Sequence, residues 1–131
     1  MEDTYSDRAE RFSLDGYHTR AKVTNVHDGD TIRAVFKMPH SDTPYKWTCR
    51  LSGIDTPELR SHDMHEVQLA EAARTELTET VLNKVVDIAC GKFDKYGRML
   101  VTISIEGVCI NDMLKNKGHA RAYDGREKMP W

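Results

Sequence analysis

The alternation of apolar and polar residues predicts β-strands over much of the first half of the chain. Apolar side chains occupy every second position in residues 30–37 and again in residues 45–52, as in strands with one buried face. A weaker alternation marks residues 20–27. Residues 38–44 contain two prolines among polar residues, which predicts a loop between the second and third strands.

The second half of the chain opens with a change of period. Residues 64–83 place apolar side chains at spacings of three and four, which predicts an amphipathic helix of about five turns. Strand-like patterns return at residues 85–89 and 99–105, with a turn-like segment between them. Residues 110–117 predict a short helix that Gly118 ends.

This order of elements predicts the fold class, a β-barrel with helices. Three strands, a helix, two or more strands and a second helix fit an antiparallel barrel of the OB type. An open α+β sheet is the alternative. Residues 1–18 carry many charges and few hydrophobic side chains, so we expect them to be poorly ordered, with the domain spanning residues 19–131.

Composition narrows the class of protein. A chain of 131 residues with 39% hydrophobic and 31% charged residues fits one soluble globular domain, and we expect a monomer. The net charge of −2 means that an anionic substrate would be met by a local cluster of Arg and Lys rather than by the field of the whole protein. No apolar run is long enough to span a membrane, and the charged N-terminal residues do not resemble a secretory signal.

The three cysteines form no CxxC pair, and their odd number argues against a disulfide framework. We expect Cys49, Cys90 and Cys109 to be small buried side chains. This usage favours a reducing, intracellular compartment.

Acidic motifs at strand ends carry the candidate chemistry. Asp30 opens one predicted strand and Asp55 follows another, and in a small barrel such ends can meet at one rim. Two carboxylates with a backbone carbonyl and water suit Ca²⁺ or Mg²⁺ better than zinc. Glu58 lies three residues after Asp55 across a proline, a plausible place for a base that activates water. Each motif alone also fits an ordinary turn or a helix cap.

Basic and aromatic residues complete this set. Arg50 and Arg98 lie on the polar faces of predicted strands, and guanidinium groups bind phosphate oxygens in a bidentate manner. Two solvated surface arginines are the alternative. Lys95, Tyr96 and Tyr123 could contact phosphate and stack on bases. Tyr96 could equally be a partly buried ring.

Together these residues resemble a known family. The motifs Asp28-Gly29-Asp30-Thr31, Asp55-Thr56-Pro57-Glu58 and Asp94-Lys95-Tyr96-Gly97-Arg98, with Arg50, follow the order and approximate spacing of the staphylococcal nuclease (thermonuclease) family. The resemblance covers about residues 20 to 123. It implies a five-stranded OB-fold barrel with packed helices. It also implies a Ca²⁺-dependent endonuclease that cuts DNA and RNA, preferably single-stranded, without strong sequence specificity and leaves 3′-phosphate ends.

The resemblance also implies a role for each residue of the set. Residues matching Asp30 and Asp55, and the backbone carbonyl of the residue matching Thr56, bind calcium. The glutamate matching Glu58 positions or deprotonates the attacking water.

The arginines matching Arg50 and Arg98 bind the phosphate and stabilise the transition state. The tyrosines matching Tyr96 and Tyr123 help hold the nucleotide, and Lys95 matches a lysine near the terminal phosphate.

This chain departs from the family's type member near its end. Residues 124–131 are too few for the long third helix, so we expect two helices, and the alignment before Tyr123 is about one residue short. Two other functions stay open: a non-catalytic OB-fold module that binds nucleic acid or protein, and a small-molecule phosphodiesterase.

Overall fold

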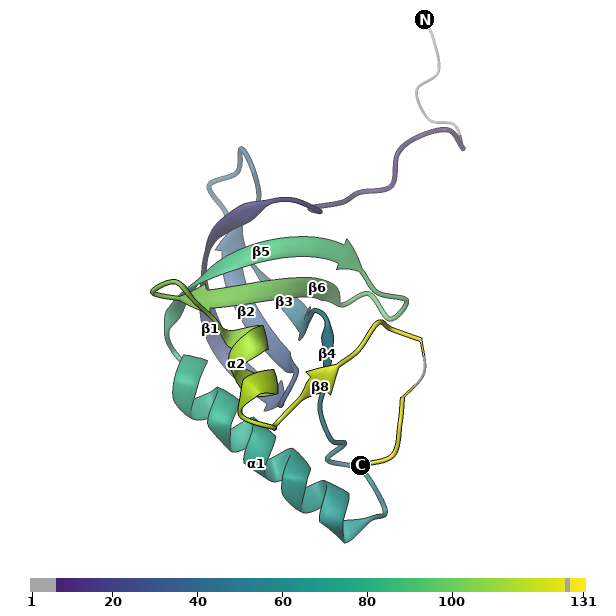
Figure 1. Ribbon diagram of the computed structural model, residues 1–131. Coiled ribbons are helices and arrows are strands. Elements are labelled where there is room, and N and C mark those ends of the chain that lie inside the picture. Colours follow the sequence, from purple (N-terminus) through teal and green to yellow (C-terminus); the bar gives the residue numbers. More distant parts are fainter. Residues whose placement is uncertain (1–6, 127) are drawn as a thin grey trace, which may run out of the picture.

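Five long strands close into a barrel in the computed structural model, which describes residues 7–126 and 128–131 (Figure 1). The strands lie in the order β3-β2-β1-β5-β6, and a parallel pairing of β3 with β6 closes the barrel. The predicted fold class, a five-stranded OB-type barrel with two packed helices, is therefore confirmed, and the open sheet is excluded. The barrel strands are β1 (His18–Asp28), β2 (Thr31–Lys37), β3 (Pro44–Leu51), β5 (Val85–Phe93) and β6 (Met99–Ile105).

Two helices and three short strands complete the described part of the chain. The helices are α1 (Met64–Val81) and α2 (Ile110–Asn116), and residues 117–126 and 128–131 form no third helix. The short strands are β4 (Ile54–Asp55), β7 (Val108–Cys109) and β8 (Arg121–Ala122). β4 pairs antiparallel with β8, which brings the C-terminal part of the chain beside the acidic motif at residue 55. Within the described residues, no helix is both long and apolar enough to cross a membrane.

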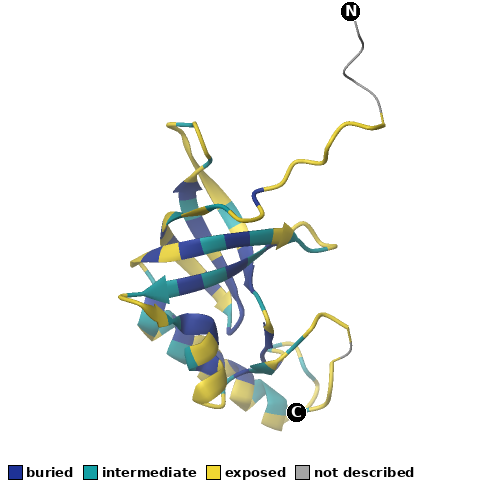
Figure 2. Ribbon diagram, turned by 45° about the horizontal axis from the view of Figure 1, so that its top comes forward, coloured by how far each residue is buried: buried dark blue, intermediate teal, exposed yellow. Residues whose placement is uncertain are grey.

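The core fills the barrel and continues beneath α1. Alternate strand residues point inward, and they are dark blue in Figure 2. Largest among the fully buried side chains are Ile32, Leu51, Leu77, Ile88 and Ile103. The apolar face predicted for the long helix packs on this core, as shown by the burial of Ala70, Ala73, Leu77 and Val81.

Backbone interactions explain where the elements differ from the sequence prediction. The long helix ends at Val81, two residues early, because Leu82 is extended and Asn83 has a φ of 63°. The N–H of Asn83 then donates to the carbonyl of Val23. β5 runs four residues beyond the predicted end, with an irregularity between Cys90 and Phe93 where it pairs with β6.

The segment before β1 is partly attached to the barrel. Leu14 is buried, the N–H of Gly16 donates to the carbonyl of Cys90, and the Tyr17 hydroxyl donates to the carbonyl of Lys37. Residues 1–6 of the segment expected to be poorly ordered lie outside the described residues. The domain limits at residues 18 and 19 stay a prediction.

Candidate active site

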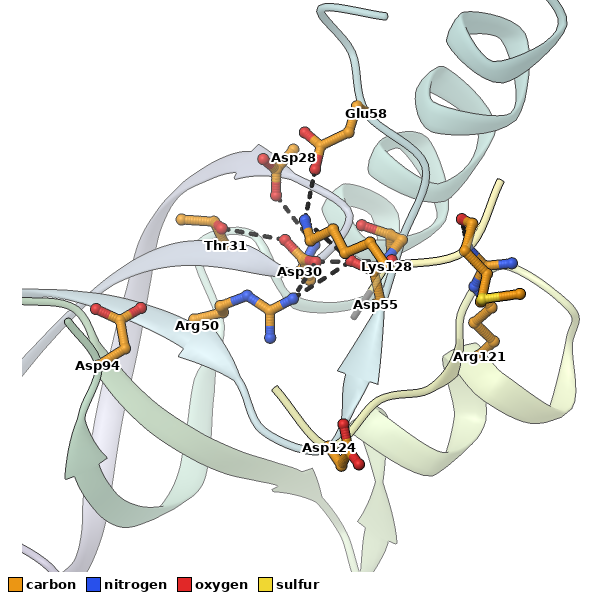
Figure 3. A network of polar contacts seen from close by, with 12 residues as sticks. Asp28, Asp30, Thr31, Arg50, Asp55, Glu58, Asp94, Arg121, Asp124 and Lys128 are labelled. Atoms are coloured by element: carbon orange, nitrogen blue, oxygen red, sulfur yellow. Dashed lines mark hydrogen bonds and ion pairs between the residues drawn. The ribbon is translucent and has the colours of Figure 1, made fainter. Parts of the chain in front are cut away.

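Two buried carboxylates converge on one guanidinium at the rim of the barrel (Figure 3). Nη2 of Arg50 lies 3.3 Å from Oδ2 of Asp30 and 3.4 Å from Oδ1 of Asp55. Asp30 comes directly before β2, Arg50 lies near the end of β3, and Asp55 ends β4. The structure therefore brings together three of the residues singled out in the sequence. Arg50 is only 7% exposed, so it is not the solvated strand residue of the alternative interpretation.

Local hydrogen bonds hold the Asp30 carboxylate in place. The backbone N–H of Thr56 donates to its Oδ2 at 3.3 Å, and the hydroxyl of Thr31 donates to its Oδ1 at 3.2 Å. In the tight turn before β2, the backbone N–H of Asp30 donates to Oδ1 of Asp28 at 3.1 Å. Asp30 and Thr56 are thus coupled although they lie 26 residues apart.

Both carboxyl groups titrate above their usual range. Burial, followed by the adjacent Asp28, raises the pKa of Asp30 to about 6, although Arg50 and the side chain of Thr56 partly oppose this rise. Burial also raises the pKa of Asp55, against the lowering effect of Lys128 and Arg50. The positive groups nearby therefore do not fully compensate the loss of hydration, and an added cation would be favoured here.

A second arginine is positioned by a turn between β5 and β6. The Nε of Arg98 donates to Oδ2 of Asp94 at 2.8 Å, and Oδ1 of Asp94 accepts the N–H groups of Tyr96 and Arg98 at 2.9 Å each. Burial alone would raise the pKa of Asp94, but these backbone donors outweigh it and lower that pKa. Asp94 therefore stays ionised and fixes Arg98 in orientation.

The remaining predicted contact residues line one pocket of about 290 Å³. The Arg50 guanidinium lies 5.3 Å from the ring centroid of Tyr123, and that of Arg98 lies 5.5 Å from the ring of Tyr96. Tyr96 is 73% exposed, so the partly buried ring of the alternative interpretation is not found. The pocket is lined by Arg50, Asp94, Lys95, Tyr96, Arg98, Leu100, Tyr123 and Gly125.

Glu58 lies at the edge of the site, on the segment between β4 and α1. Its backbone N–H donates to Oε2 of Glu66 at 2.8 Å, which fixes the backbone, while its side chain is 54% exposed. Its Oε1 lies 2.7 Å from Nζ of Lys128, and that ammonium is also 3.3 Å from Oδ1 of Asp55.

The ligand set at this rim is made of oxygen atoms. No group of three or more His, Cys, Asp or Glu side chains suited to a metal ion occurs among the described residues. Asp30 and Asp55 thus provide two carboxylates, and a cation held by them would complete its shell with carbonyl and water oxygens. Ca²⁺ and Mg²⁺ accept such ligands, so the donor chemistry fits a hard cation.

Comparison with known proteins agrees with this geometry. The model of the family described as staphylococcal nuclease homologue matches residues 48–130. The chain belongs to this family.

Relatives of this nuclease-family chain come from several different organisms. An uncharacterized protein of Bacillus anthracis is 32% identical over 110 residues, covering 81% of this chain and 49% of the relative. A probable endonuclease, LCL3, of Paracoccidioides lutzii is 29% identical over 110 residues, covering 68% of this chain and 32% of that protein. The chain thus spans about half or less of the length of these two relatives.

Sequence reasoning missed two residues of this nuclease-family site. Arg121 received no role from the sequence, but it lies in β8 and pairs with Asp55 of β4, and its guanidinium donates to carbonyls of the C-terminal residues. No sequence motif links Lys128 to this site, because its partner Glu58 lies 70 residues earlier in the chain. Only the β4–β8 pairing explains how the chain end reaches the site.

Gly29 should be required for the close approach of the acidic turn to the long helix. A Cβ at Gly29 would lie 2.8 Å from Cβ of Ala73 and 3.1 Å from Cγ2 of Thr56. We therefore expect Gly29→Ala to lower the free energy of unfolding by about 1–3 kcal/mol, measured by urea denaturation. Adding Ala73→Gly removes the first contact and should recover part of the loss. Strictly additive effects of the two substitutions would contradict this explanation.

Asp30 should make stability depend on pH when no divalent cation is present. Because its folded-state pKa of about 6 exceeds the ordinary 3.8, the folded protein binds this proton more tightly than the unfolded chain does. Wild type should therefore gain stability relative to Asp30→Asn as the pH falls through about 6, on the order of 2–3 kcal/mol once below 3.8. Urea unfolding of both proteins in chelator tests this, and identical pH profiles would refute it.

Proposed function

We propose that this protein is a Ca²⁺-dependent nuclease that hydrolyses phosphodiester bonds in DNA and RNA. The observation that carries the proposal is the position of Arg50, whose guanidinium contacts both buried carboxylates and also lines the pocket of Arg98, Tyr96 and Tyr123. A phosphate bound there would lie between two guanidiniums and an acidic cluster. Membership of the staphylococcal nuclease family supports the same reading.

In this proposal the carboxylates of Asp30 and Asp55 and the carbonyl of Thr56 hold the calcium ion. The raised pKa values of Asp30 and Asp55 support this, because the nearby positive groups do not fully compensate the burial of the two carboxylates. When bound, the ion would supply charge neutralisation and Lewis acidity to a phosphodiester.

Arg50 and Arg98 would bind the non-bridging oxygens and stabilise the charge that builds up on them. Glu58 would orient the attacking water and accept its proton. This role suits its carboxylate, which is exposed to solvent and lies at the edge of the site. The water oxygen forms the new bond to phosphorus, the bond from phosphorus to the 5′ oxygen breaks, and a solvent proton completes the leaving 5′-hydroxyl. The products would be 3′-phosphate and 5′-hydroxyl ends.

Substrate preference would follow from the pocket. Exposed Tyr96 and half-buried Tyr123 offer rings for stacking, and Lys95 offers charge for a phosphate. Stacking on an aromatic ring needs an unpaired base and accepts any base. We therefore propose a preference for single strands without strong sequence specificity, acting as a monomer.

One observation favours the second candidate, a binding module that does not cut. The ammonium of Lys128 already contacts Asp55 and Glu58, which the hydrolytic proposal needs for the cation and the water. If that contact were permanent, the arginines and tyrosines could bind nucleic acid without cleaving it.

Cleavage assays separate the two candidates. Single-stranded DNA, duplex DNA and RNA of mixed sequence are incubated with the protein in Ca²⁺ and in chelator. We expect cleavage in Ca²⁺ alone, fastest on single strands, with ends that a 3′-phosphatase converts to hydroxyls. Binding of the same oligonucleotides without any Ca²⁺-dependent cleavage would establish the binding module instead.

Substitution of two residues tests the proposed roles. Glu58→Gln and Arg98→Ala should each lower kcat by about 10²-fold or more, because each removes proton transfer or charge stabilisation that develops in the transition state. Glu71→Gln and Arg74→Ala, on exposed positions of α1, provide matched controls. Wild-type turnover by either site variant, with an unchanged unfolding curve, would remove that residue from the mechanism.

A further inference from the structure

A side chain of the protein itself already makes a cationic contact at the acidic rim. Nζ of Lys128 is 2.7 Å from Oε1 of Glu58 and 3.3 Å from Oδ1 of Asp55 (Figure 3). Asp55 ends β4, and Glu58 lies in the segment between β4 and α1. Lys128 lies 70 residues after Glu58 in the chain. Nothing in the motifs at residues 28–31, 55–58 or 94–98 requires a lysine at this point.

The chain beyond β8 is anchored so that Lys128 reaches this position. Arg121 pairs with Asp55 across the β4–β8 ladder, and its guanidinium donates to the carbonyl groups of Met129 and Pro130. The same guanidinium lies 3.9 Å from the ring centroid of Trp131. The C-terminal end therefore returns to the segment between β4 and α1 (Figure 1). We call residues 128–131 the clamp.

A divalent cation and this ammonium cannot both contact Asp55 at low cost. Like charges within a few ångströms repel, and the repulsion is strengthened where burial reduces screening. Asp55 is 1% exposed, so its carboxylate is not well screened. Glu58 and Lys128 are about half exposed, and ion pairs of this kind are weak. A divalent cation attracts the buried Asp55 carboxylate more strongly than a single positive charge does, so it can displace the Lys128 ammonium.

We propose that Lys128 is an internal competitor of the divalent cation, held on Asp55 and Glu58 by the clamp and released when the cation binds. The inference rests on the proposed function for the identity of the cation ligands. Lys128 then sets the cation concentration at which the site becomes competent. It also keeps Glu58 engaged until the cation arrives, so water activation is coupled to cation binding.

The competition is tested by Ca²⁺ affinity, measured by calorimetry without substrate. Lys128→Met should bind Ca²⁺ about two- to fivefold more tightly than wild type, the range expected for loss of a half-exposed ion pair. Lys128→Arg keeps the charge and should stay close to wild type. Trp131→Ala removes the contact between the Trp131 ring and Arg121 but keeps the lysine at position 128. This variant should also bind Ca²⁺ more tightly, because Lys128 is held less firmly. Combined with Lys128→Met, it should add little, because both substitutions act through the clamp.

Lys115→Met is the matched control, since Lys115 also pairs with a carboxylate but on α2, 3.8 Å from Asp112. It removes the same charge and should leave Ca²⁺ affinity unchanged. Thermal unfolding of every variant checks that the fold is retained.

A second readout follows the clamp itself. The chain has two tryptophans, and Trp131→Phe identifies the indole N–H signal of Trp131 in a ¹H–¹⁵N spectrum. Adding Ca²⁺ to wild type should move this signal to the position that it occupies in Lys128→Met without Ca²⁺. A signal that stays unchanged while Ca²⁺ binds would overturn the release of the clamp.

The outcomes separate this inference from the proposed function. If wild type and Lys128→Met bind Ca²⁺ with equal affinity, the competition is refuted and the nuclease proposal stands. If neither protein binds Ca²⁺, the assignment of the cation ligands fails, and the competition fails with it.

Discussion

The site depends on the contact between one buried guanidinium and two buried carboxylates. Arg50 comes from β3, Asp30 from the turn before β2 and Asp55 from β4, so the barrel must close correctly for the three to meet. Burial makes this arrangement costly, because each charged group loses hydration. The raised pKa values of both aspartates show that Arg50 does not fully offset the cost. Such a cluster does little to stabilise a fold, and in our proposal its uncompensated negative charge is what favours a cation.

Backbone interactions give this rim its shape. Asn111 is buried, and its side chain accepts the N–H of Ile103 and donates to the carbonyls of Ser52 and Val101. This one side chain joins α2 to β6 and to the segment before β4. On the other side, the Thr56 N–H joins that segment to Asp30. The Thr56 N–H thus holds the Asp30 carboxylate directly, and Asn111 holds the segment that leads into Asp55.

Much of the fold could be predicted from the period of the apolar residues. The alternation in residues 30–37 is typical of a strand, and the spacings of three and four in α1 are typical of a helix. The end of β5 could not be predicted in this way, because Gly91 and Lys92 interrupt the apolar alternation while the pairing with β6 continues. Asp30, Asp55 and Arg50 could be predicted as one site from motif order. The contacts of Arg121 and Lys128 could not, because they depend on a two-residue ladder between β4 and β8 that has no sequence signature.

The central claim is that Asp30, Asp55 and the Thr56 backbone surround one cation next to Arg50. Paramagnetic Mn²⁺, used in place of Ca²⁺, tests this most directly, since it broadens NMR signals of nearby nuclei. We predict that substoichiometric Mn²⁺ first broadens the amide signals of residues 29–31, Asp55 and Thr56, and that excess Ca²⁺ restores them. Broadening centred on other residues, or broadening that Ca²⁺ does not reverse, would contradict the account.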